Sequence, residues 1–150
     1  MVDPGWDKKR ILSTPLTLYM EYINLKRDLY LKEKTKDLNL THGDITYIVN
    51  IFYHENVSQR ELAEILYVSE ANVAKIVKRL DKNGYIERIS DESNKSRKLI
   101  TLTEEGKSTA LFLIKSIYEW ESNISEEFQQ EDIDDLRNKL YQLTIKSADN

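Results

Sequence analysis

Residues 58–89 read SQRELAEILYVSEANVAKIVKRLDKNGYIERI, and this stretch decides the fold. It opens with Ser58 and Glu61, whose spacing is that of a capping box, in which each side chain bonds the backbone of the other residue. The helix that follows places four apolar residues on its inward side: Leu62, Ala63, Ile65 and Leu66. Residues 67–69 interrupt the pattern, so the sequence predicts a short helix that ends in a turn.

A second, longer helix is predicted directly after this turn. Ser69 stands at its N-cap position, where a hydroxyl accepts a hydrogen bond from an otherwise unpaired backbone N–H. Its inward positions recur with the helical period: Val73, Ile76, Val77 and Leu80. Gly84 ends it, because glycine adopts the left-handed conformation after a helix C-terminus without strain. We therefore interpret residues 58–83 as a helix-turn-helix.

After Gly84 the apolar period changes from about 3.6 residues to 2, which indicates β-structure. Residues 85–89 and 98–103 are predicted to be paired strands, and residues 90–97 form a polar loop between them. Thr103 is the expected cap of the next helix. A two-stranded hairpin that follows a helix-turn-helix is a wing, so the predicted unit is a winged helix-turn-helix.

Helices are expected on both sides of this unit. The apolar pattern predicts helices over 11–34, after the Thr41 cap, over 104–124 and from 125 toward the C-terminus. The helix over 104–124 is expected to pack through Leu111, Ile114, Tyr118 and Trp120. The sequence thus predicts a mainly α fold, with a winged helix-turn-helix, a two-stranded wing and long terminal helices.

The expected organisation is a single domain over 1–150. Residues 57–103, here called the reading head, lie in sequence between helices expected at 11–56 and 104–147. These outer helices carry broad apolar faces that a small reading head cannot cover, which favours dimerisation through them. A dimer would also double the few base pairs that one helix-turn-helix can read.

Composition excludes several classes of protein. The 150 residues include no cysteine, so disulfides, thiolate metal sites and a nucleophilic cysteine are excluded. His42 and His54 match no standard metal spacing, and no cofactor motif or catalytic constellation is present, so no metal, cofactor or enzymatic activity is expected. No apolar run is long enough to cross a bilayer and no signal-type stretch opens the chain, which predicts a cytoplasmic protein without membrane contact.

The charge distribution favours nucleic acid at the reading head. Although the net charge is −4, residues 57–103 hold nine basic and seven acidic residues, whereas residues 104–150 hold five basic and eleven acidic residues. In a helix-turn-helix the second helix enters the major groove of DNA. Asn72 suits adenine, Lys75 suits guanine, and the cations further along suit phosphates. The candidate DNA contacts are Ser58, Gln59, Ser69, Ala71, Asn72, Lys75, Lys78, Arg79, Lys82, Lys95 and Arg97.

Residues 58–106 resemble the multiple-antibiotic-resistance regulator (MarR) family. The resemblance rests on residues 58–63 (SQRELA), on Ser69 to Leu80 followed by 83–88 (NGYIER), and on 102–107 (LTEEGK). The flanking helices resemble the family in number and order, so the similarity extends over nearly the whole chain. It implies a homodimeric regulator, usually a repressor, that binds pseudo-palindromic double-stranded DNA and is released by a small, often phenolic or anionic, ligand. It also implies that Arg88 braces the hairpin.

One feature departs from the family pattern. The wing tip of the family often carries Asp, a spacer and Arg, whereas this chain has Asn94, Lys95 and Ser96 there, with Arg97 one position later. Either Lys95 or Arg97 is then the candidate for entering the minor groove, and weak wing contacts are the alternative.

Two further hypotheses concern ligands and partners. Tyrosine offers an apolar ring with a polar hydroxyl, which suits aromatic or anionic effectors, although ordinary core packing explains the same residues. The candidate lining residues are Tyr19, Tyr22, Tyr30, Tyr47, Tyr53 and Tyr118. The alternative to a DNA-binding regulator is a winged-helix protein-interaction module, which the overall acidity favours and the basic wing tip disfavours.

Overall fold

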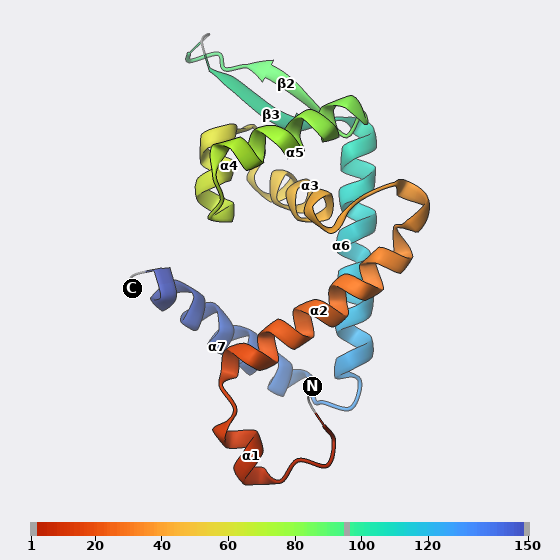
Figure 1. The fold of residues 1–150 in the computed structure, drawn as a ribbon, viewed down its shortest axis with the longest axis vertical. Coiled ribbons are helices and arrows are strands. Elements are labelled where there is room, and N and C mark those ends of the chain that lie inside the picture. Colours follow the sequence, from red (N-terminus) through yellow and green to blue (C-terminus); the bar gives the residue numbers. More distant parts are fainter. Residues whose placement is uncertain (1–2, 95–96, 149–150) are drawn as a thin grey trace. The chain divides into compact units, whose positions relative to one another are not determined.

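The computed structural model describes residues 3–94 and 97–148, and the chain divides into two compact units, Met1–Ile117 and Tyr118–Asn150. Figure 1 labels most of the described elements. In chain order they are α1 (Lys8–Ser13), α2 (Leu16–Lys34), the 3₁₀ helix η1 (Lys36–Leu38), α3 (His42–His54), β1 (Val57–Ser58), α4 (Gln59–Leu66), α5 (Glu70–Lys82), β2 (Ile86–Ser90), β3 (Lys98–Leu102), α6 (Glu104–Ser125) and α7 (Gln130–Ala148).

The predicted helix-turn-helix is present as α4 and α5, and the predicted caps set its bounds. Ser58 and Glu61 form the capping box at the start of α4, with the Ser58 backbone N–H donating to Glu61 Oε2 at 2.9 Å. Ser69 Oγ accepts from the Asn72 N–H at the start of α5. At the end of α5, Gly84 has φ +79°, and the Tyr85 N–H donates to the Leu80 carbonyl at 3.0 Å. This glycine-based stop lets the chain leave α5 directly into the hairpin.

A three-stranded antiparallel sheet closes the reading head. Strands β2 and β3 pair from Ile86↔Leu102 to Ser90↔Lys98, as the predicted hairpin requires. A third strand, β1, pairs with the other edge of β3, through Val57↔Ile100 and Ser58↔Leu99. This short strand joins the segment before α4 to the wing, so that the chain entering the helix-turn-helix belongs to the same sheet as the hairpin.

The apolar core lies beneath α4 and α5. The inward residues of α5 are all buried, as the helical period predicts: Val73, Ile76, Val77 and Leu80. They belong to one cluster with Ile48 and Ile51 of α3, Leu62 of α4 and Leu113 of α6. Complete burial of such side chains contributes about 2 kcal/mol each. The core therefore fixes α5 with its opposite face outward.

Two sequence predictions about the flanking helices are wrong in detail. The single helix predicted over 11–34 is broken at Thr14, which is extended, and Pro15, which precedes α2. The ring of a proline disfavours the helical conformation in the residue before it, which explains the break. In α6, Leu111 and Tyr118 are exposed, whereas the buried side runs through Thr109, Ala110, Leu113 and Ser116.

The buried side of α6 carries several small residues because it approaches the α5–β2 junction closely. Gly106 lies so near the Tyr85 carbonyl that an added Cβ would stand 1.9 Å from its oxygen. The Thr103 hydroxyl donates to the Gly84 carbonyl at 2.6 Å and accepts from the Gly106 N–H at 3.0 Å. Thr103 thus caps α6, as predicted, and also anchors it to the end of α5.

The unit Tyr118–Asn150 consists of the end of α6 and of α7. The predicted apolar stripe of α7 is half-buried at Ile133 and Leu140 and exposed at Leu136 and Leu143. No residue of the described part of α7 is buried. An apolar stripe left open to solvent is typical of a helix that packs against a further chain.

Candidate nucleic-acid interface

The outward face of α5 is polar, basic and open to solvent. Ala71, Asn72 and Lys75 are exposed near its N-terminus, and Lys78 and Lys82 are exposed further along. Among the described residues, these side chains make no hydrogen bond or ion pair, so they are available to a ligand. The arrangement matches that of a recognition helix, in which residues near the N-terminus face base edges and later cations face phosphates.

Arg79 has a different environment from its neighbours on α5. Its guanidinium donates twice to Asp44 Oδ1, at 2.9 Å from Nε and 2.6 Å from NH2, and once to Thr41 Oγ1 at 3.0 Å. The Asp44 side chain is 1% exposed, and the Arg79 guanidinium is the cation that pairs with this buried carboxylate. Asp44 also caps α3 by accepting from the Thr41 N–H. Arg79 therefore holds α5 against the start of α3.

Arg97 likewise lies in an ion-pair network. Its NH2 group lies 2.5 Å from Glu61 Oε1 of the α4 capping box, and its NH1 group lies 3.7 Å from Asp91. The same NH2 group donates to Ser58 Oγ at 3.4 Å. These contacts attach the base of the wing loop to the N-terminus of α4. A guanidinium held in this way positions the wing rather than projecting from it.

The remaining candidates divide between the two helix N-termini and the wing. The Ser58 side chain is buried and is occupied by the capping box, whereas Gln59 is half-buried and Ser69 is exposed. Lys95 lies outside the described residues. Arg88, expected to brace the hairpin, has its Nε 3.8 Å from Asp81 Oδ2 of α5. Gln59, Ser69 and the outward residues of α5 thus lie on the same winged domain. Ser58 instead belongs to the capping box that starts α4.

The sequence did not single out as functional the four residues that hold Arg79 and Arg97 in place: Thr41, Asp44, Glu61 and Asp91. Asp44 and Arg79 lie 35 positions apart, and Glu61 and Arg97 lie 36 apart. The local signals in the sequence were the Ser58–Glu61 capping box and the Thr41 cap, which indicate a helix start but no distant arginine.

The capping box of α4 makes a prediction about pH. The Arg97 guanidinium, together with the Ser58 backbone and hydroxyl, lowers the pKa of Glu61 to about 2. A lowered pKa stabilises the folded state above about pH 4.5, and that contribution is lost as the pH falls toward 2. Because nearly half of the Glu61 side chain is exposed, solvent screening keeps the effect modest.

In Glu61→Gln, urea unfolding midpoints should therefore fall less steeply between pH 4.5 and 2 than in the wild type. Glutamine keeps the capping-box acceptor, so the variant isolates the charge. Equal slopes for the two proteins would show that Glu61 and Arg97 do not interact.

The candidate tyrosines differ in their surroundings. Tyr47 is buried in the core with no hydrogen-bond partner for its hydroxyl among the described residues, and burial raises its pKa. Tyr53 and Tyr118 are exposed, and Tyr53 stacks edge-on with Phe52. On α2, Tyr19 donates to the Ile11 carbonyl, while the rings of Tyr22 and Tyr30 lie beside lysines. A tyrosine-lined effector cleft stays a prediction.

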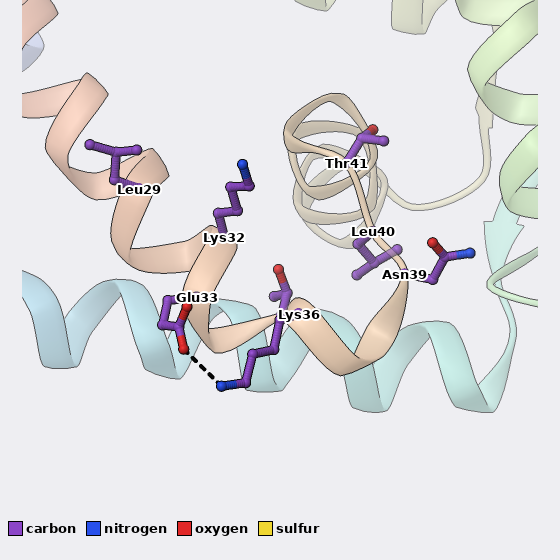
Figure 2. Close-up of a pocket in the computed structure, with 8 residues that line it drawn as sticks. Leu29, Lys32, Glu33, Lys36, Asn39, Leu40 and Thr41 are labelled. Carbon is purple, nitrogen blue, oxygen red and sulfur yellow. Dashed lines mark hydrogen bonds and ion pairs between the residues drawn. The ribbon is translucent and has the colours of Figure 1, made fainter.

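A pocket of about 540 Å³ lies where α2, η1 and α3 meet, and Figure 2 shows it. Its lining combines Leu29 and Leu40 with Lys32, Asn39 and Thr41, and no tyrosine is among its lining residues. The other lysine of the pocket, Lys36, is turned to Glu33, with 2.8 Å between Nζ and Oε1 (Figure 2). The pocket adjoins the contact that holds α5 against α3, because its lining residue Thr41 also accepts a hydrogen bond from Arg79.

Neither a membrane-spanning helix nor a cluster of metal ligands is found among the described residues. None of the described helices is both long and apolar enough to span a membrane. Within residues 3–94 and 97–148, no three His, Cys, Asp or Glu side chains group as a metal site would require.

A helix-turn-helix whose second helix is basic and open, followed by a hairpin on a shared sheet, defines a winged helix-turn-helix domain. Comparison with known proteins gives the same class: residues 40–97 match the model of the MarR family. The resemblance to the MarR family drawn from the sequence is therefore confirmed over residues 40–97.

Relatives by sequence are named as transcriptional regulators of the helix-turn-helix type. The uncharacterized HTH-type transcriptional regulator YybA of Bacillus subtilis (strain 168) is 39% identical over 72 residues, which span 48% of each chain. The HTH-type transcriptional regulator BilQ of Clostridioides difficile (strain CD3) is 28% identical over 129 residues, covering 83% of this chain and 86% of BilQ. The more similar match thus spans about half of the relative's length.

Solved structures extend the likeness over nearly the whole fold. A crystal structure of MarR superposes with a TM-score of 0.82 at 22% identity and covers 96% of this chain and 95% of that one. A MarR family transcriptional regulator from Listeria monocytogenes, complexed with 26mer DNA, has a TM-score of 0.80 at 25% identity, with 91% of each chain covered. The mainly α fold with its wing is therefore that of MarR-type regulators.

Proposed function

We propose that the protein is a cytoplasmic, sequence-specific DNA-binding transcription regulator that acts as a homodimer. The observation that carries the proposal is the open face of α5, on which Asn72, Lys75 and Lys78 are exposed within a winged helix-turn-helix. The DNA complex of the Listeria monocytogenes neighbour supports it, since that protein shares the fold over 91% of this chain. Enzymatic activity forms no part of the proposal.

The contacts are assigned by position along α5. Ala71, Asn72 and Lys75 face base edges, where an amide suits adenine and an ammonium suits the acceptors of guanine. Lys78 and Lys82 bind phosphates, and Gln59 and Ser69 do so from helix N-termini. Arg79 and Arg97 act indirectly, by holding α5 and the wing in place, because both are paired with carboxylates. Lys95 is proposed as the cation that the wing offers to the minor groove.

The homodimer is supported by apolar surface on the outer helices. On α2, Leu16, Leu18, Ile23, Leu25 and Leu29 are all about half exposed or more, and α7 exposes Leu136, Leu143 and Ile145. Apolar residues in such number on two helices favour burial against a second copy. Two recognition helices related by a two-fold axis would then read a pseudo-palindromic operator.

Binding at an operator would repress the adjacent gene, and a small effector would release the DNA. The pocket at the α2–η1–α3 junction supports this part, because Lys32 offers a cation to an anionic ligand and Thr41 contacts Arg79 of the recognition helix. A titration of salicylate-like acids should weaken DNA binding of the wild type and leave that of Lys32→Ala less affected. No response of the wild type to a broad panel would remove the effector from the proposal.

DNA binding is tested by salt-dependent titration of labelled genomic fragments. Lys78→Ala should weaken binding at all sequences and reduce the salt slope by about 1, because one phosphate contact is lost. Asn72→Ala should instead cost about tenfold at preferred sites and relax base preference, with the slope unchanged. Lys139→Ala removes the same charge from α7 and serves as the matched control.

A protein that ignores DNA even at low salt would contradict the regulator. That result would favour the alternative, a winged-helix module that docks another protein.

A further inference from the structure

Tyr67 occupies a backbone conformation that its side chain disfavours. It is the residue after α4 and has φ +52° and ψ +43°, in the left-handed region. Glycine adopts this region freely and asparagine tolerates it, whereas a bulky residue there is an outlier. Of the other three described non-glycine residues with positive φ, Asn39 and Asn56 are asparagines and only Glu55 is not. The turn of the helix-turn-helix therefore holds a strained aromatic residue.

Within the described residues, no contact of the Tyr67 ring offsets the strain of its backbone. Tyr67 is 87% exposed, more than any other large apolar side chain in the described ranges. Its side chain makes no hydrogen bond, ion pair or ring contact with the residues in these ranges. Its backbone is held by neighbours on both sides: the Tyr67 N–H donates to the Glu64 carbonyl and the Val68 N–H to the Ala63 carbonyl. The turn is thus fixed whatever the side chain, and folding does not require a tyrosine.

The position of this ring is the second observation. Only Val68 separates Tyr67 from Ser69, the N-cap of α5, and Asn72 lies five residues on. The N-terminal end of α5 is the end that approaches base edges in the proposed complex. A tyrosine side chain extends several ångströms and carries a neutral donor, and tyrosine is among the side chains that bind DNA phosphates. A neutral donor suits this position because the negative charge of the neighbouring Glu70 carboxylate would partly cancel the charge of a cation there.

We propose that Tyr67 is a DNA-contacting residue that binds the sugar–phosphate backbone beside the N-terminus of the recognition helix, with its hydroxyl donating to a phosphate oxygen. The inference rests on the proposed DNA-binding function and adds a contact from the turn, outside the two helices and the wing. Strain that is retained at one exposed residue is consistent with a functional role.

Two substitutions separate this role from a structural one. Tyr67→Asn relieves the backbone strain and removes the ring, so the urea midpoint should stay equal or rise while DNA affinity falls about tenfold. Tyr67→Phe keeps the ring and the strain and removes only the hydroxyl, so its DNA affinity should fall by most of the same tenfold factor. Because no charge is lost, the salt slope should stay that of the wild type in both variants. Tyr141→Phe on α7 is the matched control and should bind as the wild type does.

The outcomes are distinguishable from a failure of the proposed function. If the wild type binds DNA and both variants bind equally well, the contact from Tyr67 is disproved and the regulator stands. If Tyr67→Asn loses affinity together with stability, the residue is structural and the inference fails. If the wild type does not bind DNA, the proposed function itself fails.

Discussion

Replacing Gly106 with alanine is expected to lower the free energy of unfolding by about 3 kcal/mol. The new Cβ would stand 1.9 Å from the Tyr85 carbonyl oxygen, 2.9 Å from its carbonyl carbon and 3.2 Å from the Leu102 Cβ. The first of these separations is far inside van der Waals contact, and the atom that must move belongs to the backbone. The α5–β2 junction and the first turn of α6 would have to separate, which would break the bonds made by Thr103.

The matched control is Gly43→Ala. Gly43 lies in the first turn of α3, and a Cβ added there meets Thr41 Oγ1 at 3.7 Å and Ile76 Cδ1 at 3.8 Å, which is ordinary contact. That variant should be neutral or gain up to about 1 kcal/mol, because alanine reduces the entropy of the unfolded chain. Urea denaturation of the two variants measures the difference. Equal stabilities would show that α6 does not pack against Tyr85 as closely as described.

Removing Arg79 is expected to have an effect of similar size for an electrostatic reason. In Arg79→Ala the Asp44 carboxylate, 1% exposed, would lose its charged partner, which we expect to cost about 3 kcal/mol. The neighbouring Lys78 is exposed with no such partner, so Lys78→Ala should change stability by no more than about 0.5 kcal/mol. Urea denaturation at neutral pH compares the two variants directly.

A double-mutant cycle with Asp44→Asn measures how strongly the pair is coupled. With the carboxylate neutralised, the further loss of Arg79 should cost much less than it does alone. Additive effects would show that the two side chains do not interact. Titration with DNA separates the two cations in a second way, since at temperatures where both variants are folded Lys78→Ala should lower the salt slope and Arg79→Ala should not.

Local signals in the sequence were sufficient for the helices and hairpin of the reading head. The caps at Ser58, Ser69 and Thr103 and the stop at Gly84 each depend on a few adjacent residues, and all four are present. The outward face of α5 also followed, because the helical period fixes which residues are buried. Strand β1 was missed, since two residues are too few to show a period of two.

Long-range pairing explains what the sequence could not show. Arg79 was expected to bind phosphate, and nothing near it in the chain indicated that it would meet Asp44 on α3. Arg97 was one of two candidates, with Lys95, for entering the minor groove, and nothing near it indicated that it would pair with Glu61. A cation on a predicted outer face has two possible partners, a ligand or a distant carboxylate, and periodicity does not distinguish them. The inward side of α6 was misassigned for a related reason, because the close approach at Gly106 selects small residues over large apolar ones.

The central claim is that the face of α5 holding Asn72 and Lys75 reads a duplex twice, once from each subunit of a symmetric pair. Selection of bound fragments from a random DNA pool by the purified protein tests it most directly. The account predicts a consensus of two inverted half-sites centred about one helical turn apart, and Asn72→Ala should lose preference at the same position in both halves. A pool that stays random after repeated rounds, or a single half-site without symmetry, would contradict it.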